Sequence, residues 1–345
     1  FFLILYFIFR TIGRTTRISK NIRRWKKMRR YRKARQLTNY GLCQLAEGDW
    51  QRAEQTLIKA AQITKSPLIN YLAAARTAQA QQAYERRDNY LRQAHMTTKG
   101  SGIAVGLTQA QLQINSKQWE QALATLKHLN RKDPHHRYTL KLLMTVYKQL
   151  HDWAQLQKLL PSLRKYKVLS GNELTLLERK IYRALLAEAY QKDTTTLIET
   201  WKAFSRHWHH DIELIRAYTH YLIAHREDAR AIALIENILK KQWDPVLVEN
   251  YGLAHGAMPA KQLNSAESWL KKYPQESQLL LCLGRLSIRD KLWGKAQEYL
   301  TDSIQLAPTT AAYKELGTVL EALNEKEAAL KVYKKGIEQT DENCH

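Results

Sequence analysis

Residues 36–67 read QLTNYGLCQLAEGDWQRAEQTLIKAAQITKSP, and their pattern recurs along the chain. An apolar stripe at helical spacing opens at Tyr40 and stops at the Gly48-Asp49 pair, which is a turn signal. A second stripe at helical spacing consists of Trp50, Ala53, Leu57 and Ala60. The small residue at Ala53 favours two helices that cross closely. This stretch therefore predicts an antiparallel helical hairpin.

Trp50 marks a register that returns at steps of 33 to 35 residues within each run of copies. Its counterparts, each at the expected start of a second helix, are Tyr84, Trp119, Trp153, Trp293 and Lys326. The position of Ala53 is then held by Arg87, Ala122, Leu156, Ala296 and Ala329. A helix–turn–helix unit with a period near 34 is the tetratricopeptide repeat, TPR. The sequence predicts an all-α, TPR-like right-handed superhelical solenoid of about nine helical hairpins.

Register and composition divide the chain into six segments. They are the end of a transmembrane helix (1–9), a basic juxtamembrane helix (10–35), N-terminal TPR-like repeats (36–160), degenerate helical repeats (161–274), C-terminal TPR repeats (275–340) and a tail (341–345). Pro161 predicts an interruption after the fourth hairpin. Between Asn172 and Tyr273 the repeat marks weaken although helical periodicity persists.

The first nine residues, FFLILYFIF, are wholly apolar. Nine helical residues rise only about 14 Å against a hydrocarbon core of about 30 Å, so they predict the last turns of a membrane helix that starts earlier. Basic residues follow this run, whereas a signal peptide carries them before it. A short buried helix or an apolar tail is the alternative.

The segment 10–35 contains thirteen Lys or Arg and no acid, and it supplies +13 of the formal net charge of +23. Such a helix is expected at an anionic bilayer surface, where the contacting residues would be Arg17, Lys20, Arg24, Trp25 and Lys27. The positive-inside rule then places the repeats in the cytoplasm. A basic arm that binds nucleic acid is the competing interpretation. The position of the charge directly after an apolar run favours the membrane, so no nucleic-acid partner is expected.

First helices of TPR hairpins line a concave surface. In this frame the expected partner-binding groove is basic and consists of Arg76, Lys141, Lys148, Arg183, Arg216, His220, Arg285 and Lys314. A basic groove suits an acidic peptide, a carboxylate-bearing molecule or an acidic protein face. The alternative is a scatter of solvated charges, since residues 36–345 carry 42 basic and 32 acidic side chains.

Other candidate sites are weaker. Three histidines around Trp208, namely His207, His209 and His210, could bind haem iron or a metal, or could be solvated or packing side chains. The glycines of 100–106 resemble a dinucleotide loop, but no strand precedes them. Three isolated cysteines form neither a disulfide framework nor a zinc pattern. No catalytic residues, metal or cofactor are predicted.

Several stretches together resemble one known family. They are RRWKKMRR (23–30), LTNYG (37–41), AEGDWQRAE (46–54), WDPVLV (243–248), AESWLK (266–271) and LCLGR (281–285). This combination is similar to the HemY-type tetratricopeptide proteins of the proteobacterial inner membrane. The resemblance implies two N-terminal membrane helices, a cytoplasmic repeat domain and an association with haem biosynthesis. It supplies no catalytic motif.

The expected function is a non-enzymatic, membrane-tethered scaffold or regulator that binds late haem-pathway enzymes. Haem or porphyrin carriage in the basic groove is a variant, because basic residues pair with propionates. The alternative is a general adaptor for envelope assembly or protein quality control, since a fold does not fix a function. An enzyme is the third and least favoured class.

Overall fold

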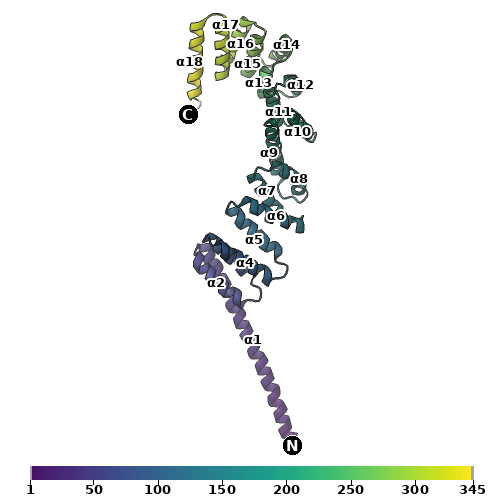
Figure 1. The fold of residues 1–345 in the computed structure, drawn as a ribbon, viewed down its shortest axis with the longest axis vertical. Helices are drawn as coiled ribbons and strands as arrows, with labels where there is room; N and C mark the ends of the chain where they lie inside the picture. The colour runs from purple at the N-terminus through teal and green to yellow at the C-terminus, as the bar shows by residue number, and fades with distance from the viewer. Residues whose placement is uncertain (1, 343–345) are drawn as a thin grey trace. The chain divides into compact units, whose positions relative to one another are not determined.

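The computed structural model describes the backbone of residues 2–342 and the side chains of residues 25–339. Over that range the chain forms eighteen α-helices and one short 3-10 helix, and no strand (Figure 1). The helices pair into nine consecutive hairpins. The prediction of an all-α fold built from about nine TPR-like hairpins is confirmed for the described part of the chain.

The first helices of the hairpins are α1 (Phe2–Glu47), α3 (Leu68–Ala80), α5 (Gly102–Asn115), α7 (Arg137–Gln149), α9 (Gly171–Tyr190), α11 (Ile212–Ala224), α13 (Pro245–Leu253), α15 (Ser277–Arg289) and α17 (Thr310–Ala322). The second helices are α2 (Trp50–Ile63), α4 (Tyr84–Thr97), α6 (Trp119–Lys132), α8 (Trp153–Lys165), α10 (Thr194–Lys202), α12 (Asp228–Leu239), α14 (Pro259–Leu270), α16 (Trp293–Leu306) and α18 (Lys326–Glu342). The 3-10 helix η1 (Trp208–His210) follows α10.

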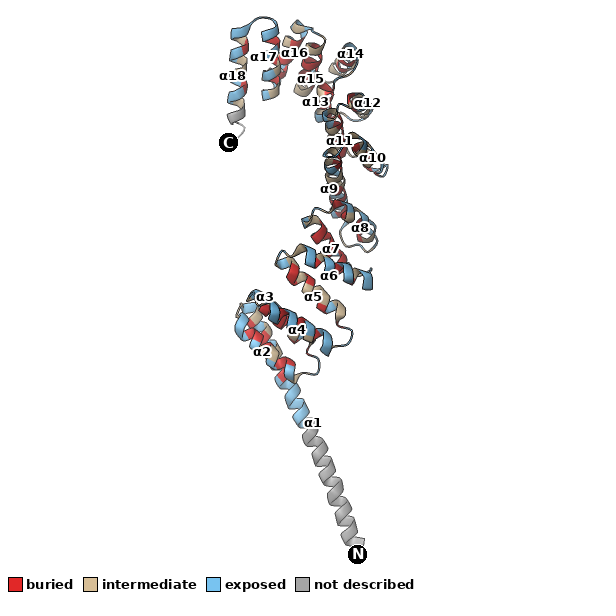
Figure 2. Cartoon of the chain, viewed as in Figure 1, coloured by how far each residue is buried: buried red, intermediate tan, exposed pale blue. Residues whose placement is uncertain are grey.

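The chain divides into two compact units, Phe1–Thr175 and Leu176–His345. Unit 1 contains the first four hairpins, and unit 2 contains most of α9 and the helices after it. In both units the buried residues lie on the helix faces that meet a neighbouring helix (Figure 2). Unit 2 has an aromatic core. Trp201 stacks on Tyr218 at 4.4 Å between ring centroids, and Trp243 stacks on Tyr273 at 3.8 Å.

The register predicted from Trp50 is the register of the structure. Each predicted mark is the first residue of a second helix, from Trp50 in α2 to Lys326 in α18. The residue three positions later is buried in every copy, including the Arg87 side chain, which donates to Asp88 at 2.7 Å and to Gln79 at 2.8 Å. Apolar periodicity therefore located the interior of six hairpins correctly.

Seven of the hairpin turns share one backbone geometry. A residue in the left-handed region lies two positions before the second helix, at Gly48, Gln82, Lys117, His151, Arg226, Lys291 and Asn324. The next residue donates its N–H to a carbonyl five residues earlier, for example Asp49 to Gln44 at 3.0 Å and Gln118 to Gln113 at 2.9 Å. This is the Schellman ending of a helix. It caps the first helix and redirects the chain into the second.

The predicted interruption at Pro161 is wrong. Pro161 lies inside α8, which continues to Lys165. A proline removes one helical hydrogen bond and costs about 3 kcal/mol in a helix interior. The buried side chains on both sides of it hold α8 in place by packing, namely Trp153, Leu156, Leu159, Leu160 and Leu163.

The basic segment and the first repeat share one helix. The expected boundaries after residues 9 and 35 both fall inside α1, which is continuous from Phe2 to Glu47. Packing against the repeats begins at Ala34, which is 3% exposed, and Thr38 is hydrogen-bonded to Asn70 of α3 at 2.9 Å. The part of α1 from Trp25 to Lys33 is exposed along its whole length.

Candidate partner-binding surface

All eight residues predicted for the basic groove lie on first helices. Arg76, Lys141 and Lys148 belong to α3 and α7 in unit 1, and the other five belong to α9, α11, α15 and α17 in unit 2. Five of the eight are exposed: Arg76, Lys141, Arg183, His220 and Lys314. Arg216 and Arg285 are different, because each is held by carboxylates of the fold.

Arg216 on α11 is bound to two acids. Its Nε lies 3.1 Å from both carboxylate oxygens of Asp244, and its Nη1 lies 2.7 Å from Glu213. The Asp244 side chain is only 5% exposed, and it also accepts the N–H of Leu247 at 2.9 Å as the N-cap of α13. The hydrogen bond to Asp244 raises the pKa of Arg216 above its usual value. Asp244 therefore caps the N-terminus of α13 and connects that helix to α11.

Arg285 on α15 is the most buried of these cations, with a side chain 9% exposed. Its Nε donates to Glu315 of α17 at 3.1 Å, and its Nη1 lies 3.8 Å from Glu249 of α13. The guanidinium thus connects three successive first helices. Burial of an arginine is tolerated because acids on both sides compensate its charge.

Arg179 on α9 completes the set. It donates to Asp211, the N-cap of α11, at 2.8 Å. We call Arg179, Arg216 and Arg285 the arginine ladder of unit 2, because each bonds to an acid of the following first helix. The ladder neutralises part of the charge that the sequence assigned to the groove. The predicted cations of unit 2 that remain exposed are Arg183 and Lys314, and His220 on α11 is exposed as well.

One open depression in unit 2 contains a predicted groove residue. It has a volume of about 490 Å³, and we call it the α9 pocket. It is lined by Leu176, Arg179, Lys180, Arg183, Ala184, Ala187 and Tyr221. Three of these seven side chains are cationic and none is acidic. Of the predicted residues, the structure brings only Arg183 into this pocket.

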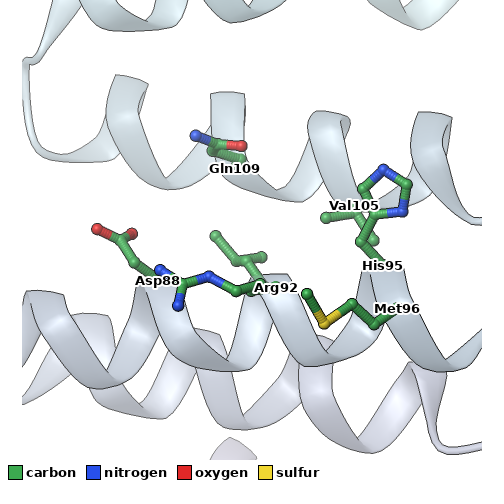
Figure 3. A pocket seen from close by; sticks show the side chains of 7 residues that line it. Asp88, Arg92, His95, Met96, Val105 and Gln109 are labelled. Carbon is green, nitrogen blue, oxygen red and sulfur yellow. The ribbon is translucent and has the colours of Figure 1, made fainter.

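A second depression lies between α4 and α5 in unit 1 and was not predicted (Figure 3). Its volume is about 440 Å³, and its lining is Asp88, Leu91, Arg92, His95, Met96, Val105 and Gln109. Figure 3 shows the charged residues along α4 facing Val105 and Gln109 of α5. The glycine at position 100 was the signal in the sequence, because it predicts a turn between two helices. In the structure Gly100 lies in that turn with a φ of +78°. The lining of the depression contains one acid, Asp88, and one cation, Arg92, so it carries no preferred charge.

The three candidate haem or metal histidines do not form one cluster. His209 lies with Nε2 2.8 Å from the carbonyl oxygen of Trp201, whereas His207 and His210 are exposed. The His207 ring lies edge-on to the Trp208 ring, with 5.2 Å between the ring centroids. Among residues whose side chains are described, no group of three or more His, Cys, Asp or Glu is placed to hold a metal ion.

The predicted membrane-surface residues fall partly outside the described side chains. Arg17, Lys20, Arg24 and the apolar segment 1–9 lie outside the residues whose side chains are described. Trp25 and Lys27 are described, and both are exposed. The Arg29 guanidinium lies 5.4 Å from the Trp25 ring centroid. No described helix combines the length and the apolar composition needed to cross a membrane. At 100° per residue, the six cations from Lys26 to Lys33 spread over about 220° of the circumference of α1, and Met28 and Tyr31 lie in the remaining sector. We call Trp25–Lys33 the cationic collar.

These features define the chain as a TPR-like helical-hairpin repeat protein with charged first helices. Residues 1–82 match the family model described as the HemY protein N-terminus. The curated Protein HemY of Escherichia coli K12 and that of Shigella flexneri are each 26% identical over 341 residues, which is 99% of this chain and 86% of theirs. The predicted resemblance to HemY-type proteins is confirmed.

Solved TPR structures are also similar. A tetratricopeptide repeat protein from Parabacteroides merdae shares 14% identity with a TM-score of 0.37, covering 89% of this chain and 99% of that one. The TPR2AB domain of yeast Sti1, solved as a complex with pHSP90, shares 13% identity with a TM-score of 0.37, covering 79% of this chain and 99% of that one.

Proposed function

We propose that this chain is a non-enzymatic, membrane-tethered scaffold that holds enzymes of haem biosynthesis through its first-helix surface. The observation that carries the proposal is the similarity to Protein HemY along 99% of the chain. The exposed cations Arg76, Lys141, Arg183 and Lys314 support it, because they offer an acidic partner several contacts. A scaffold on one surface raises the effective concentration of the partners that it holds.

The proposed location is the cytoplasmic face of the bacterial inner membrane. The apolar residues 1–9 would end a membrane helix, and the cationic collar would meet anionic headgroups, at about 1 kcal/mol for each cation near the surface. Flotation with vesicles of phosphatidylglycerol and of phosphatidylcholine tests this part. The apolar residues contribute to binding to both kinds of vesicle. The difference in binding between the two lipids therefore measures the electrostatic contribution of the cationic collar. Equal binding in low and high salt would contradict it.

Site-directed photocrosslinking in membranes tests the scaffold itself. The photoreactive residue is placed at Arg76 or at Lys314, both exposed on first helices, and at Arg206 as a matched exposed position in the α10–η1 connection. We expect haem-pathway enzymes to be captured from the first two positions and not from the third. Capture of envelope-assembly factors in their place would support the general adaptor.

Haem carriage is distinguished by a separate measurement. Titration of the purified chain with haem should shift the Soret band at micromolar concentration if the groove carries haem. Replacement of His207, His209 and His210 by alanine then shows whether these histidines ligate the iron. An unchanged Soret band contradicts carriage and leaves the scaffold intact.

A further inference from the structure

We propose that the α9 pocket is a docking site for an acidic segment of a partner protein that inserts one large apolar side chain. The proposal rests on the scaffold function and names the chemistry of one partner contact. It starts from α9 itself, the longest of the first helices that lie wholly within the repeats, with 20 residues.

The two faces of α9 differ sharply. On one face Leu177, Ile181 and Leu186 are buried, and Leu186 belongs to the core of unit 2. On that side Tyr182 contacts the rings of Phe204 and Trp208 at 4.4 and 5.2 Å. On the other side Leu176 is 61% exposed, although its neighbour Leu177 is 6% exposed. The core therefore holds α9 in a fixed rotation that presents the pocket-lining side chains to solvent.

The floor of the pocket is apolar and has room above it. Ala184 and Ala187 lie one turn apart on α9, and their small side chains leave space for a larger one. The wall is Tyr221 of α11, whose ring stacks on Tyr190 at 4.6 Å and 15° between planes. Leu176 forms part of the rim. A leucine or phenylalanine of a partner would bury apolar surface against this floor, which favours binding.

The charge of the pocket selects an acidic partner. Arg179, Lys180 and Arg183 are spaced along α9, and no lining residue is acidic. Arg179 is fixed in place by Asp211, whose side chain is 9% exposed, so this guanidinium is already oriented before a ligand arrives. Arg183 is exposed and offers bidentate hydrogen bonds to a carboxylate. A polyanion such as nucleic acid would satisfy the cations but would leave the apolar floor empty.

The test uses the full chain and three labelled hexapeptides, with affinity read by fluorescence anisotropy. The first contains four glutamates and two leucines, the second has glutamine for each glutamate, and the third has alanine for each leucine. The first peptide should bind at least about tenfold more tightly than either of the others, because each of the others lacks either the charged or the apolar contact. A tenfold change in affinity corresponds to about 1.4 kcal/mol.

Two variants and one control locate the binding. Arg183→Glu removes a cation and adds an acid, and Ala187→Trp fills the floor, so each should weaken binding of the first peptide about tenfold. Arg206→Glu makes the same charge change at an exposed position outside the pocket and should alter the affinity less than about twofold. Circular dichroism of each variant confirms that the helices are retained.

Three results would overturn the docking site. They are equal binding of the three peptides, equal weakening by Arg183→Glu and Arg206→Glu, and binding of a labelled oligonucleotide that competes fully with the first peptide. The photocrosslinking experiment is independent of these results. If haem-pathway enzymes are still captured by the Arg183→Glu chain, the scaffold stands and its contact lies on another surface.

Discussion

Arg216 and Asp244 lie 28 residues apart in the chain, and the arginine Nε is 3.1 Å from both oxygens of a carboxylate that caps α13. This pair couples the first helix of one hairpin to the start of the next hairpin. Asp244 is almost fully buried, and Arg216 is the cation that compensates it. Loss of the arginine would leave a buried carboxylate uncompensated.

Arg216→Leu should therefore destabilise unit 2 by about 2 kcal/mol, less than the loss of a fully buried pair because Arg216 is 30% exposed. Urea unfolding monitored by circular dichroism measures it. Arg206→Leu, at an exposed position, should change the free energy of unfolding by less than about 0.5 kcal/mol. Similar changes in the free energy of unfolding for the two substitutions would show that the arginine ladder does not stabilise unit 2.

A second prediction concerns the Schellman turns. Lys117 has a φ of +57°, a backbone conformation that costs free energy for residues other than glycine. Lys117→Gly should raise the free energy of unfolding by about 0.5 to 1 kcal/mol, after the greater freedom of glycine in the unfolded chain is subtracted. Gly48→Ala is the reverse change, at φ +82°, and should lower it. Thermal melts that move in the same direction for both variants would contradict this.

A third prediction concerns glycines on which helices cross. A Cβ at Gly284 would lie 2.5 Å from Cγ of Leu300, a flexible side chain of the same hairpin. A Cβ at Gly252 would lie 2.9 Å from the backbone Cα of Cys282 on the next first helix. Gly284→Ala should cost about 1 to 3 kcal/mol, and a second change, Leu300→Ala, should recover part of that cost.

Gly252→Ala should not be recovered by any single side-chain truncation, because the backbone of α15 has to move. The measurement is the coupling free energy from denaturant unfolding of single and double variants. Additive effects of Gly284→Ala and Leu300→Ala would mean that these two positions do not touch.

A fourth prediction is the behaviour of Tyr90 in alkali. Burial, and then a hydrogen bond of 2.7 Å to Glu54, raise the pKa of Tyr90 from 10.0 to about 12. The folded state therefore holds this proton more tightly than the unfolded state. Its stabilising contribution is complete below pH 10 and is lost as the pH rises through about 12.

Tyr90→Phe should make the loss of stability between pH 10 and pH 12 shallower, as measured by urea unfolding at several pH values. Tyr299→Phe should act in the same way, because Tyr299 bonds to Glu267 at 3.2 Å and its pKa is also raised to about 12. The matched control is Tyr40→Phe, which removes the same hydroxyl at an exposed position.

The last prediction compares two thiols. Cys282 is fully buried, and burial raises its pKa from 9.0 to about 12, whereas Cys43 is exposed. In a chain carrying Cys344→Ser, a maleimide should modify Cys43 within minutes and Cys282 only when unit 2 unfolds, because the thiolate is the reactive form. Mass spectrometry of peptides from the native and urea-treated chain reads this directly. Equal labelling of both in the native chain would contradict the burial of α15.

Local features made much of the fold predictable. The apolar period, the residue that opens each second helix, which is aromatic in five of the six marked copies, and the buried residue three positions later are all properties of a single hairpin. They located α2, α4, α6, α8, α16 and α18 from the sequence. The hairpin of α9 and α10 and that of α13 and α14 were harder, because neither uses the left-handed turn that the other seven share. The prediction at Pro161 failed for the opposite reason. The local preference of proline to interrupt a helix was outweighed by the packing of the buried side chains of α8.

The sequence by itself determined the hairpin repeat and which positions of each helix are buried, because helical periodicity is a local property. Only the tertiary structure decided which cations remain available. Arg216 and Arg285 have the same sequence character as Arg183, yet acids about 30 residues away compensate the first two and leave the third exposed. Charge compensation depends on which side chains neighbouring hairpins bring within about 3 Å, and no local pattern records that distance.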